Sequence, residues 1–152
     1  MSTPRPSQIP RGFRFAATSC GLKKTGGLDL ALITSDTPAT AAAVFTTNLV
    51  QAAPVVLSRE HVRVAARRMR AIVVNSGNAN CCTGRAGMRA SRHTAARTAR
   101  EIGCKSDEVV VCSTGVIGVP MKVERILSAL PALADSRAAR GESFDAVTHA
   151  IM

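Results

Sequence analysis

The 152-residue sequence contains no tryptophan, no tyrosine and only four phenylalanines. The core must therefore be aliphatic, and a chain of this length can bury one without help from disulfides or metal. Aromatic side chains that would stack on the bases of a single-stranded nucleic acid are scarce. No run of about 18 apolar residues occurs, which argues against a membrane span.

A secretory signal is also missing, because the first twelve residues have no apolar stretch. This segment holds three prolines and two arginines. We interpret residues 1–12 as a flexible N-terminal arm and residues 13–152 as one domain. With no export or membrane signal, the cytoplasm is the expected location.

Metal-binding patterns are absent as well. The five cysteines are an odd number and form no Cys-x-x-Cys pair, and only His61, His93 and His149 could complete a metal site. We expect free thiols in a reducing compartment and no metal site.

Acidic residues are few, and the net charge is +10. Ten arginines lie between Arg59 and Arg100, where Glu60 is the one acid before Glu101. Such a segment can bind nucleic acid, form a solvated helix face, or dock on an acidic partner or substrate. No zinc-finger or RNA-recognition signature accompanies it, so a solvated face is favoured over nucleic-acid binding.

The hydrophobic pattern predicts a mixed α/β domain with helices packed on a sheet. We predict strands at 28–34 and 41–45, paired antiparallel through a turn at 35–38, and further strands at 54–57, 71–74 and 109–112. We predict four helices, at 58–69, 88–102, 123–130 and from 143 onward. Ser58 is expected to cap the first and Gly103 to end the second, and residues 131–141 are expected to form a loop or a broken helix.

Two polar loops follow apolar strands, a common place for ligand sites. The loop at 75–84 is rich in Asn and Gly, and it reads either as a tight self-bonded connection or as a rigid floor for a polar ligand. The loop at 113–118 reads either as an ordinary Ser/Thr turn or as a source of hydroxyl and N–H donors for the oxyanion of an acyl transfer. Neither a Ser-His-Asp set nor a Cys-His pair can be assembled from the spacing.

These loops carry a resemblance to a known family. Residues 75–84, NSGNANCCTG, resemble the NSGNANACTG signature of the ornithine acetyltransferases, the glutamate N-acetyltransferases of arginine biosynthesis. Residues 113–118 resemble the STGVIG motif of that family, and similar matches, in order, occur at 26–33, 45–48, 52–55 and 150–152. The departures are small, with Cys81 in place of Ala and Leu22 in place of Ile. The match runs from about residue 10 to residue 152 and corresponds to the N-terminal (alpha-chain) part of the family.

The resemblance implies a fold, an activity and an assembly. The expected fold is an αββα sandwich. The expected activity is acetyl transfer from N-acetylornithine to glutamate through an acetyl-enzyme on a Thr that self-cleavage exposes. Some members also accept acetyl-CoA. No metal or organic cofactor is implied, and the two chains are expected to form a heterotetramer.

Carried onto this sequence, the resemblance makes Thr114 and Gly115 the oxyanion donors, through the Thr114 hydroxyl and the Gly115 N–H. Residues 75–80 are expected to support the site, and no substrate-binding residue is assigned. The nucleophilic Thr is expected beyond residue 152. This chain alone should then be truncated and inactive. Its surface should be apolar where the C-terminal (beta) chain covers it. A related acyltransferase of a secondary-metabolite pathway and an inactive remnant are the alternatives.

Overall fold

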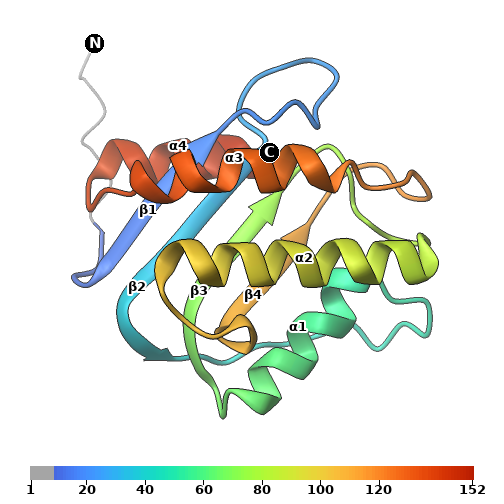
Figure 1. Cartoon of the computed structure of the whole chain (residues 1–152), viewed down its shortest axis with the longest axis horizontal. Coiled ribbons are helices and arrows are strands. Elements are labelled where there is room, and N and C mark those ends of the chain that lie inside the picture. The colour runs from blue at the N-terminus through green and yellow to red at the C-terminus, as the bar shows by residue number, and fades with distance from the viewer. Residues whose placement is uncertain (1–8) are drawn as a thin grey trace.

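A computed structural model describes residues 9–152, so residues 1–8 of the predicted N-terminal arm lie outside the described residues. The elements follow the order (Figure 1) β1 Phe13–Thr18, β2 Leu30–Thr40, α1 Ala53–Val64, β3 Arg68–Asn75, α2 Gly84–Ile102, the 3₁₀ turn η1 Ser106–Glu108, β4 Val109–Ser113, α3 Val123–Asp135 and α4 Gly141–Ile151.

The strands form one sheet in the order β1-β2-β3-β4. Strands β1, β2 and β3 are antiparallel neighbours, whereas β4 runs parallel to β3. Helix α2 makes the crossover that a parallel pair requires. The carboxyl ends of β3 and β4 therefore lie at the same edge of the sheet.

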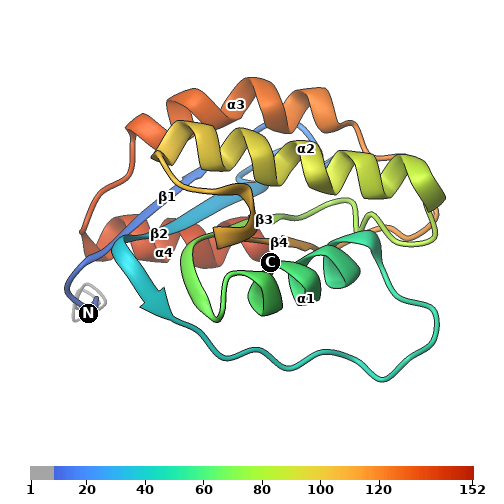
Figure 2. The ribbon, with the colours of Figure 1, turned by 60° about the horizontal axis from the view of Figure 1, so that its bottom comes forward.

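Helices cover both faces of the sheet (Figure 2): α2 and α3 lie on one side and α4 on the other. Side chains alternate between these layers because successive strand residues point to opposite faces. Leu30 and Leu32 of β2 join the core under α2 and α3, while Ala31 joins Phe15 in the core under α4. The mixed α/β class is confirmed. Residues 9–152 supply one sheet, so the second sheet of an αββα sandwich would come from outside them.

The central elements confirm the sequence prediction. Strands β3 and β4 and helix α2 lie where the pattern put them, within a few residues. Gly103 ends α2 in the left-handed conformation, with φ of 71°. The buried face of α2 consists of small residues, among them Ala95 and Ala99, which let the helix lie close to the sheet.

The predicted hairpin of 28–34 with 41–45 is wrong. Residues 35–38 form no turn, because β2 continues to Thr40 across a register shift between Thr34 and Ala39. Such a bulge bends a strand without ending it. Residues 41–45 are not a strand, and β2 pairs instead with β3 and with β1, which the sequence analysis did not predict.

The predicted strand at 54–57 is the first turn of α1. Pro54 is tolerated there because the first N–H groups of a helix have no partner within it. Ser58 is not the helix cap. It lies inside α1, where its hydroxyl donates to Val111 O at 2.8 Å and accepts from Val111 N at 3.0 Å, so α1 is fixed to the edge strand β4.

Helix α3 continues through Pro131 to Asp135, beyond the predicted end at residue 130. Leu130 and Leu133 are both fully buried in the core, and their packing holds the helix together across the proline. None of the helices among residues 9–152 is long and apolar enough to span a membrane.

A buried carboxylate fixes the segment that precedes β2. Asp29 accepts hydrogen bonds from the backbone N–H groups of Cys20 at 2.6 Å, Leu22 at 2.6 Å and Lys23 at 3.0 Å. Burial by itself would raise the pKa of Asp29. The hydrogen bonds that the carboxylate accepts outweigh this effect and lower the pKa; they come from the N–H groups of Cys20 and Lys23, the Cys20 thiol and the Leu22 N–H. The ionised carboxylate therefore stabilises the fold.

Replacing Asp29 with Asn should destabilise the domain by about 2 kcal/mol, because an amide NH₂ would face N–H donors. The pKa is lower in the folded state, so the stabilisation is complete above the unfolded value of about 3.9 and is lost as pH falls through the folded value. Urea unfolding as a function of pH measures this: the difference in free energy of unfolding between wild type and Asp29→Asn should shrink in acid.

The control is Asp36→Asn, which removes an exposed ion pair with Arg14 and should cost less than about 1 kcal/mol. Equal losses for the two variants would contradict the assignment.

Candidate active site

The two polar loops lie side by side at the carboxyl ends of β3 and β4. The Thr114 N–H donates to Asn75 O at 2.9 Å, and the Ala79 N–H donates to Val116 O at 3.0 Å. An isolated bridge between Asn78 and Val116 extends the parallel pairing beyond the strands. The loops that the sequence analysis singled out separately therefore form one structural unit.

Gly115 makes this close approach sterically feasible. Its φ is 124°, and a Cβ at this position would lie 2.5 Å from the Gly77 carbonyl carbon and 2.6 Å from Asn78 N. These atoms belong to the backbone and cannot move aside like the end of a flexible side chain. Residue 115 must therefore be glycine for its N–H to sit where it does.

The side chains of Asn75 and Asn78 bond to the protein itself. Asn75 Oδ1 accepts from the Ser113 hydroxyl at 2.6 Å, and its Nδ2 donates to Asn78 O at 2.8 Å. Asn78 Nδ2 donates to Val119 O at 3.1 Å and to Pro120 O at 3.3 Å. Both residues are buried, so these amides fix the two loops to each other.

Asn80 fixes the same unit to helix α2. Its Nδ2 donates to Gly87 O and to the Ser91 hydroxyl, both at 2.9 Å, and its Oδ1 accepts from the Thr83 hydroxyl at 2.8 Å. Of the two interpretations left open for this loop, the structure supports the self-bonded connection. The support role expected for residues 75–80 agrees with these contacts.

Thr114 and Gly115, the predicted oxyanion donors, are adjacent and exposed. In the described part of the chain, neither the Thr114 hydroxyl nor the Gly115 N–H has a hydrogen-bond partner. The neighbouring Thr114 N–H, in contrast, is bonded to Asn75 O. Two unpaired donors on a rigid support are an arrangement that can stabilise developing negative charge on an acyl oxygen.

Sequence analysis missed two contacts that hold this support in place. The Ser76 N–H donates to Asp29 O at 2.9 Å, and its hydroxyl donates to Ala150 O at 2.5 Å. The first joins the loop to the backbone carbonyl that precedes β2, which any residue at position 29 would supply. The second joins the loop to α4 through a backbone carbonyl and leaves no signal in sequence.

The thiols near the site are poor nucleophiles. Burial raises the pKa of Cys112, and the hydrogen bond with Cys81 raises the pKa of Cys82, so little thiolate forms at neutral pH. All five cysteines are free. His61 is buried against Val109 O at 2.8 Å, and residues 9–152 contain no cluster of His, Cys, Asp and Glu arranged to hold a metal ion.

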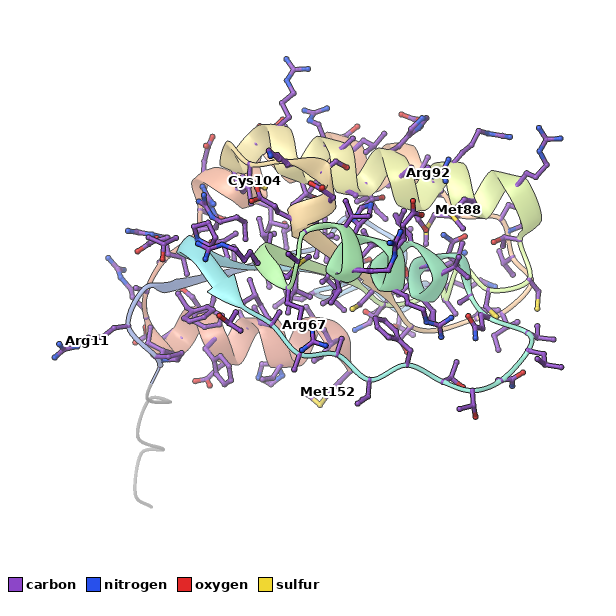
Figure 3. The ribbon with its side chains drawn as sticks, turned by 90° about the horizontal axis from the view of Figure 1, so that it is seen from below. Arg11, Arg67, Met88, Arg92, Cys104 and Met152 are labelled. Carbon is purple, nitrogen blue, oxygen red and sulfur yellow. The ribbon has the colours of Figure 1, made fainter. Side chains whose placement is uncertain are left out.

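Most arginines of the segment between Arg59 and Arg100 are exposed, as the solvated-face, nucleic-acid and partner-docking interpretations all require. Helix α2 carries half of the ten arginines (Figure 3, where Arg92 is labelled), with Arg97 half-buried and bonded to Glu101 at 2.5 Å. The exposed arginines of this helix are Arg85, Arg89, Arg92 and Arg100.

Comparison with known proteins identifies the family. The ArgJ family model matches residues 14–152. The chain belongs to the ArgJ family. The ArgJ bifunctional arginine biosynthesis protein of Geobacter sulfurreducens is 56% identical over 123 residues, which cover 81% of this chain and 31% of that relative. The Gloeobacter violaceus protein is 49% identical over 142 residues, covering 93% and 34%.

Solved structures of the family share the fold. The ornithine acetyltransferase of Mycobacterium tuberculosis, solved in complex with ornithine, superposes with a TM-score of 0.89 at 37% identity, covering 95% of this chain and 77% of that one. The ArgJ protein of Bacillus halodurans gives 0.87 at 35% identity, covering 93% and 72%. The chain spans about a third of the length of the curated relatives it matches.

Substituting Gly115 with Ala should destabilise the domain by about 2–4 kcal/mol, since both the positive φ and the overlap with residues 77–78 oppose a Cβ. The matched control is Gly118→Ala. Gly118 also has a positive φ of 79°, but no atom lies within 4 Å of an added Cβ, so the loss should be about 1–2 kcal/mol. Thermal or urea unfolding compares the two variants, and equal losses would contradict the interlocked geometry.

Proposed function

We propose that the complete protein containing this chain transfers the acetyl group of N-acetylornithine to glutamate. The proposal is supported chiefly by the exposed, unpaired pair of donors at Thr114 and Gly115 in a chain of the ArgJ family. The curated relatives named above are arginine biosynthesis proteins, and the M. tuberculosis relative was solved with ornithine bound.

In the proposed reaction, a threonine hydroxyl from the part of the protein that follows residue 152 attacks the acetyl carbonyl. The carbonyl oxygen becomes an oxyanion, which accepts hydrogen bonds from the Thr114 hydroxyl and the Gly115 N–H. The C–N bond then breaks and the amine leaves as ornithine, taking up a proton. The acetyl ester on threonine is next attacked by the amine of glutamate, which releases the threonine and forms N-acetylglutamate. No metal or cofactor takes part in this route.

The proposed nucleophile is exposed by self-cleavage of a precursor, and the resulting chains form a heterotetramer. A covering partner is supported by large apolar side chains on the surface. Residues 41–52 form a long connection between β2 and α1 along one side of the domain (Figures 2 and 3). In this segment Val44 is 100%, Leu49 98% and Val50 66% exposed.

The same segment has a defined shape in spite of its exposure. Gln51 Nε2 donates to Asn48 O at 2.9 Å, Arg59 donates to Gln51 Oε1 at 2.8 Å, and the Arg59 guanidinium lies 5.2 Å from the centre of the Phe45 ring. A shaped loop that presents apolar side chains is typical of an interface. We therefore assign it to contact with the remaining two thirds of the protein.

Replacing Thr114 with Ala in the complete protein should slow acetyl transfer by about 100-fold or more, because losing one oxyanion donor costs about 3–4 kcal/mol. Thr114→Ser keeps the hydroxyl and should retain most of the rate. Steady-state exchange between N-acetylornithine and glutamate gives both values. An unchanged rate in Thr114→Ala would overturn the assignment. Since the side chain is exposed, the unfolding midpoints of both variants should match wild type.

Replacing Leu49 and Val50 with Ser should weaken the assembly of the complete protein, because both side chains would lose apolar contact area. Gel filtration over a dilution series should show dissociation at higher protein concentration than in wild type. The control is Val64→Ser at the end of α1, which is 51% exposed and lies outside the segment. Assembly unaffected by the double substitution would show that this segment faces solvent.

A further inference from the structure

Two adjacent cysteines lie in the loop that follows β3. The sulfur atoms of Cys81 and Cys82 are 3.8 Å apart, close enough for one thiol to donate a hydrogen bond to the other. Cys82 is exposed and Cys81 is half-buried, so the pair is open to solvent. The proposed acetyl transfer uses neither thiol, and the family signature quoted above has Ala at position 81. The candidate active site therefore leaves this pair unexplained.

The backbone holds the two thiols in a fixed relation. Asn80, which precedes the pair, is bonded to α2 and to the Thr83 hydroxyl. The Cys81 carbonyl accepts a hydrogen bond from the Gly118 N–H at 2.9 Å. Cys82 has a φ of 57°, in the left-handed region that residues other than glycine seldom adopt. Such a conformation persists only where the surrounding contacts impose it, and it is typical of ligand-binding loops.

The separation of the sulfur atoms suits one bridging atom better than a disulfide. A disulfide usually joins residues whose Cα atoms are at least about 4.4 Å apart. Adjacent residues joined by a trans peptide have Cα atoms only about 3.8 Å apart, which lies outside that range. A metal ion about 2.3 Å from each sulfur would span the observed 3.8 Å with an S–metal–S angle of about 110°. An angle of that size is ordinary for a tetrahedral or a trigonal ion.

A third sulfur shares a cavity with the pair. Met121 and Cys82 both line a cavity of about 290 Å³, together with Thr83 and Gly118. No carboxylate or imidazole is among the lining residues in the described part of the chain. Calcium and magnesium require oxygen ligands, and structural zinc sites require four strong ligands. Two thiolates and a thioether instead match the preference of soft ions such as Cu(I).

We infer that Cys81, Cys82 and Met121 form a binding site for a thiophilic ion of the Cu(I) type. The sequence analysis considered only cysteine and histidine as ligands and did not anticipate a thioether. A soft ion displaces the protons of the thiols that coordinate it, so the low thiolate content of the free protein does not prevent binding. Each thiol releases its proton to solvent and the ion keeps its oxidation state, so no oxidant or reductant is consumed. The inference does not depend on the proposed function, in which no metal takes part.

Competition with a chromophoric Cu(I) chelator tests the site on the complete protein, kept reduced and free of oxygen. Wild type should withdraw one Cu(I) per chain from the chelator. Cys81→Ala should weaken Cu(I) binding by about hundredfold or more, because the two thiols act together as a chelate. The family signature shows that the loop accommodates Ala at position 81, so the unfolding midpoint of this variant should match wild type.

The matched control is Cys104→Ala, which removes a half-buried thiol at the opposite end of α2. Its Cu(I) affinity should stay within about twofold of wild type. Equal Cu(I) affinity in wild type and Cys81→Ala would overturn the inference, as would equal losses in Cys81→Ala and Cys104→Ala. Zn(II) bound as tightly as Cu(I) would overturn the assignment to a soft ion.

X-ray absorption at the copper edge tests the third ligand. Wild type should show three sulfur neighbours around the ion, and Met121→Leu should show two and bind Cu(I) about tenfold more weakly. Leu preserves the apolar volume, and the control Met69→Leu makes the same swap in the core at the far end of β3. Two sulfur neighbours in wild type, or equal losses of affinity in the two methionine variants, would overturn the assignment of Met121.

Discussion

The backbone contact between Gly115 and residues 77–78 fixes the geometry on which the candidate site depends. Parallel pairing of β3 and β4 brings both loops to one edge of the sheet, but it does not by itself orient the residues that follow. Orientation comes from the absence of a Cβ at Gly115 and from the side chains of Asn75, which accepts from the Ser113 hydroxyl, and Asn78, which donates to Val119 O. Among residues 9–152, the Thr114 hydroxyl and the Gly115 N–H have no hydrogen-bond partner, because their neighbours satisfy one another.

Asp29 extends the same unit away from the donors. Its carboxylate organises residues 20–23 and its carbonyl accepts from Ser76. Residues 20–23 and the two polar loops therefore share a single buried support, with Gly77 packed between Leu22 and Gly115.

The sequence allowed good predictions where a local pattern decided the structure. The apolar runs of β3 and β4, the helix at 88–102 and its stop at Gly103 are all local signals, and each was confirmed. The loop motifs allowed the family to be predicted correctly. The segment from residue 35 to residue 58 was mispredicted because distant contacts override its local signals. A bulge against β3 carries β2 through the apparent turn, and the bond of Ser58 to Val111 lies 53 residues away in sequence.

Amide hydrogen exchange of the chain, followed by NMR, tests the interlock most directly. The N–H groups of Thr114 and Ala79 are bonded across the loops, so they should exchange about tenfold or more slowly than the unpaired N–H of Gly115. This pattern would place the Gly115 donor on a fixed support. Fast exchange at all three positions would mean that the loops are not locked together, and the account of the oxyanion site would fail.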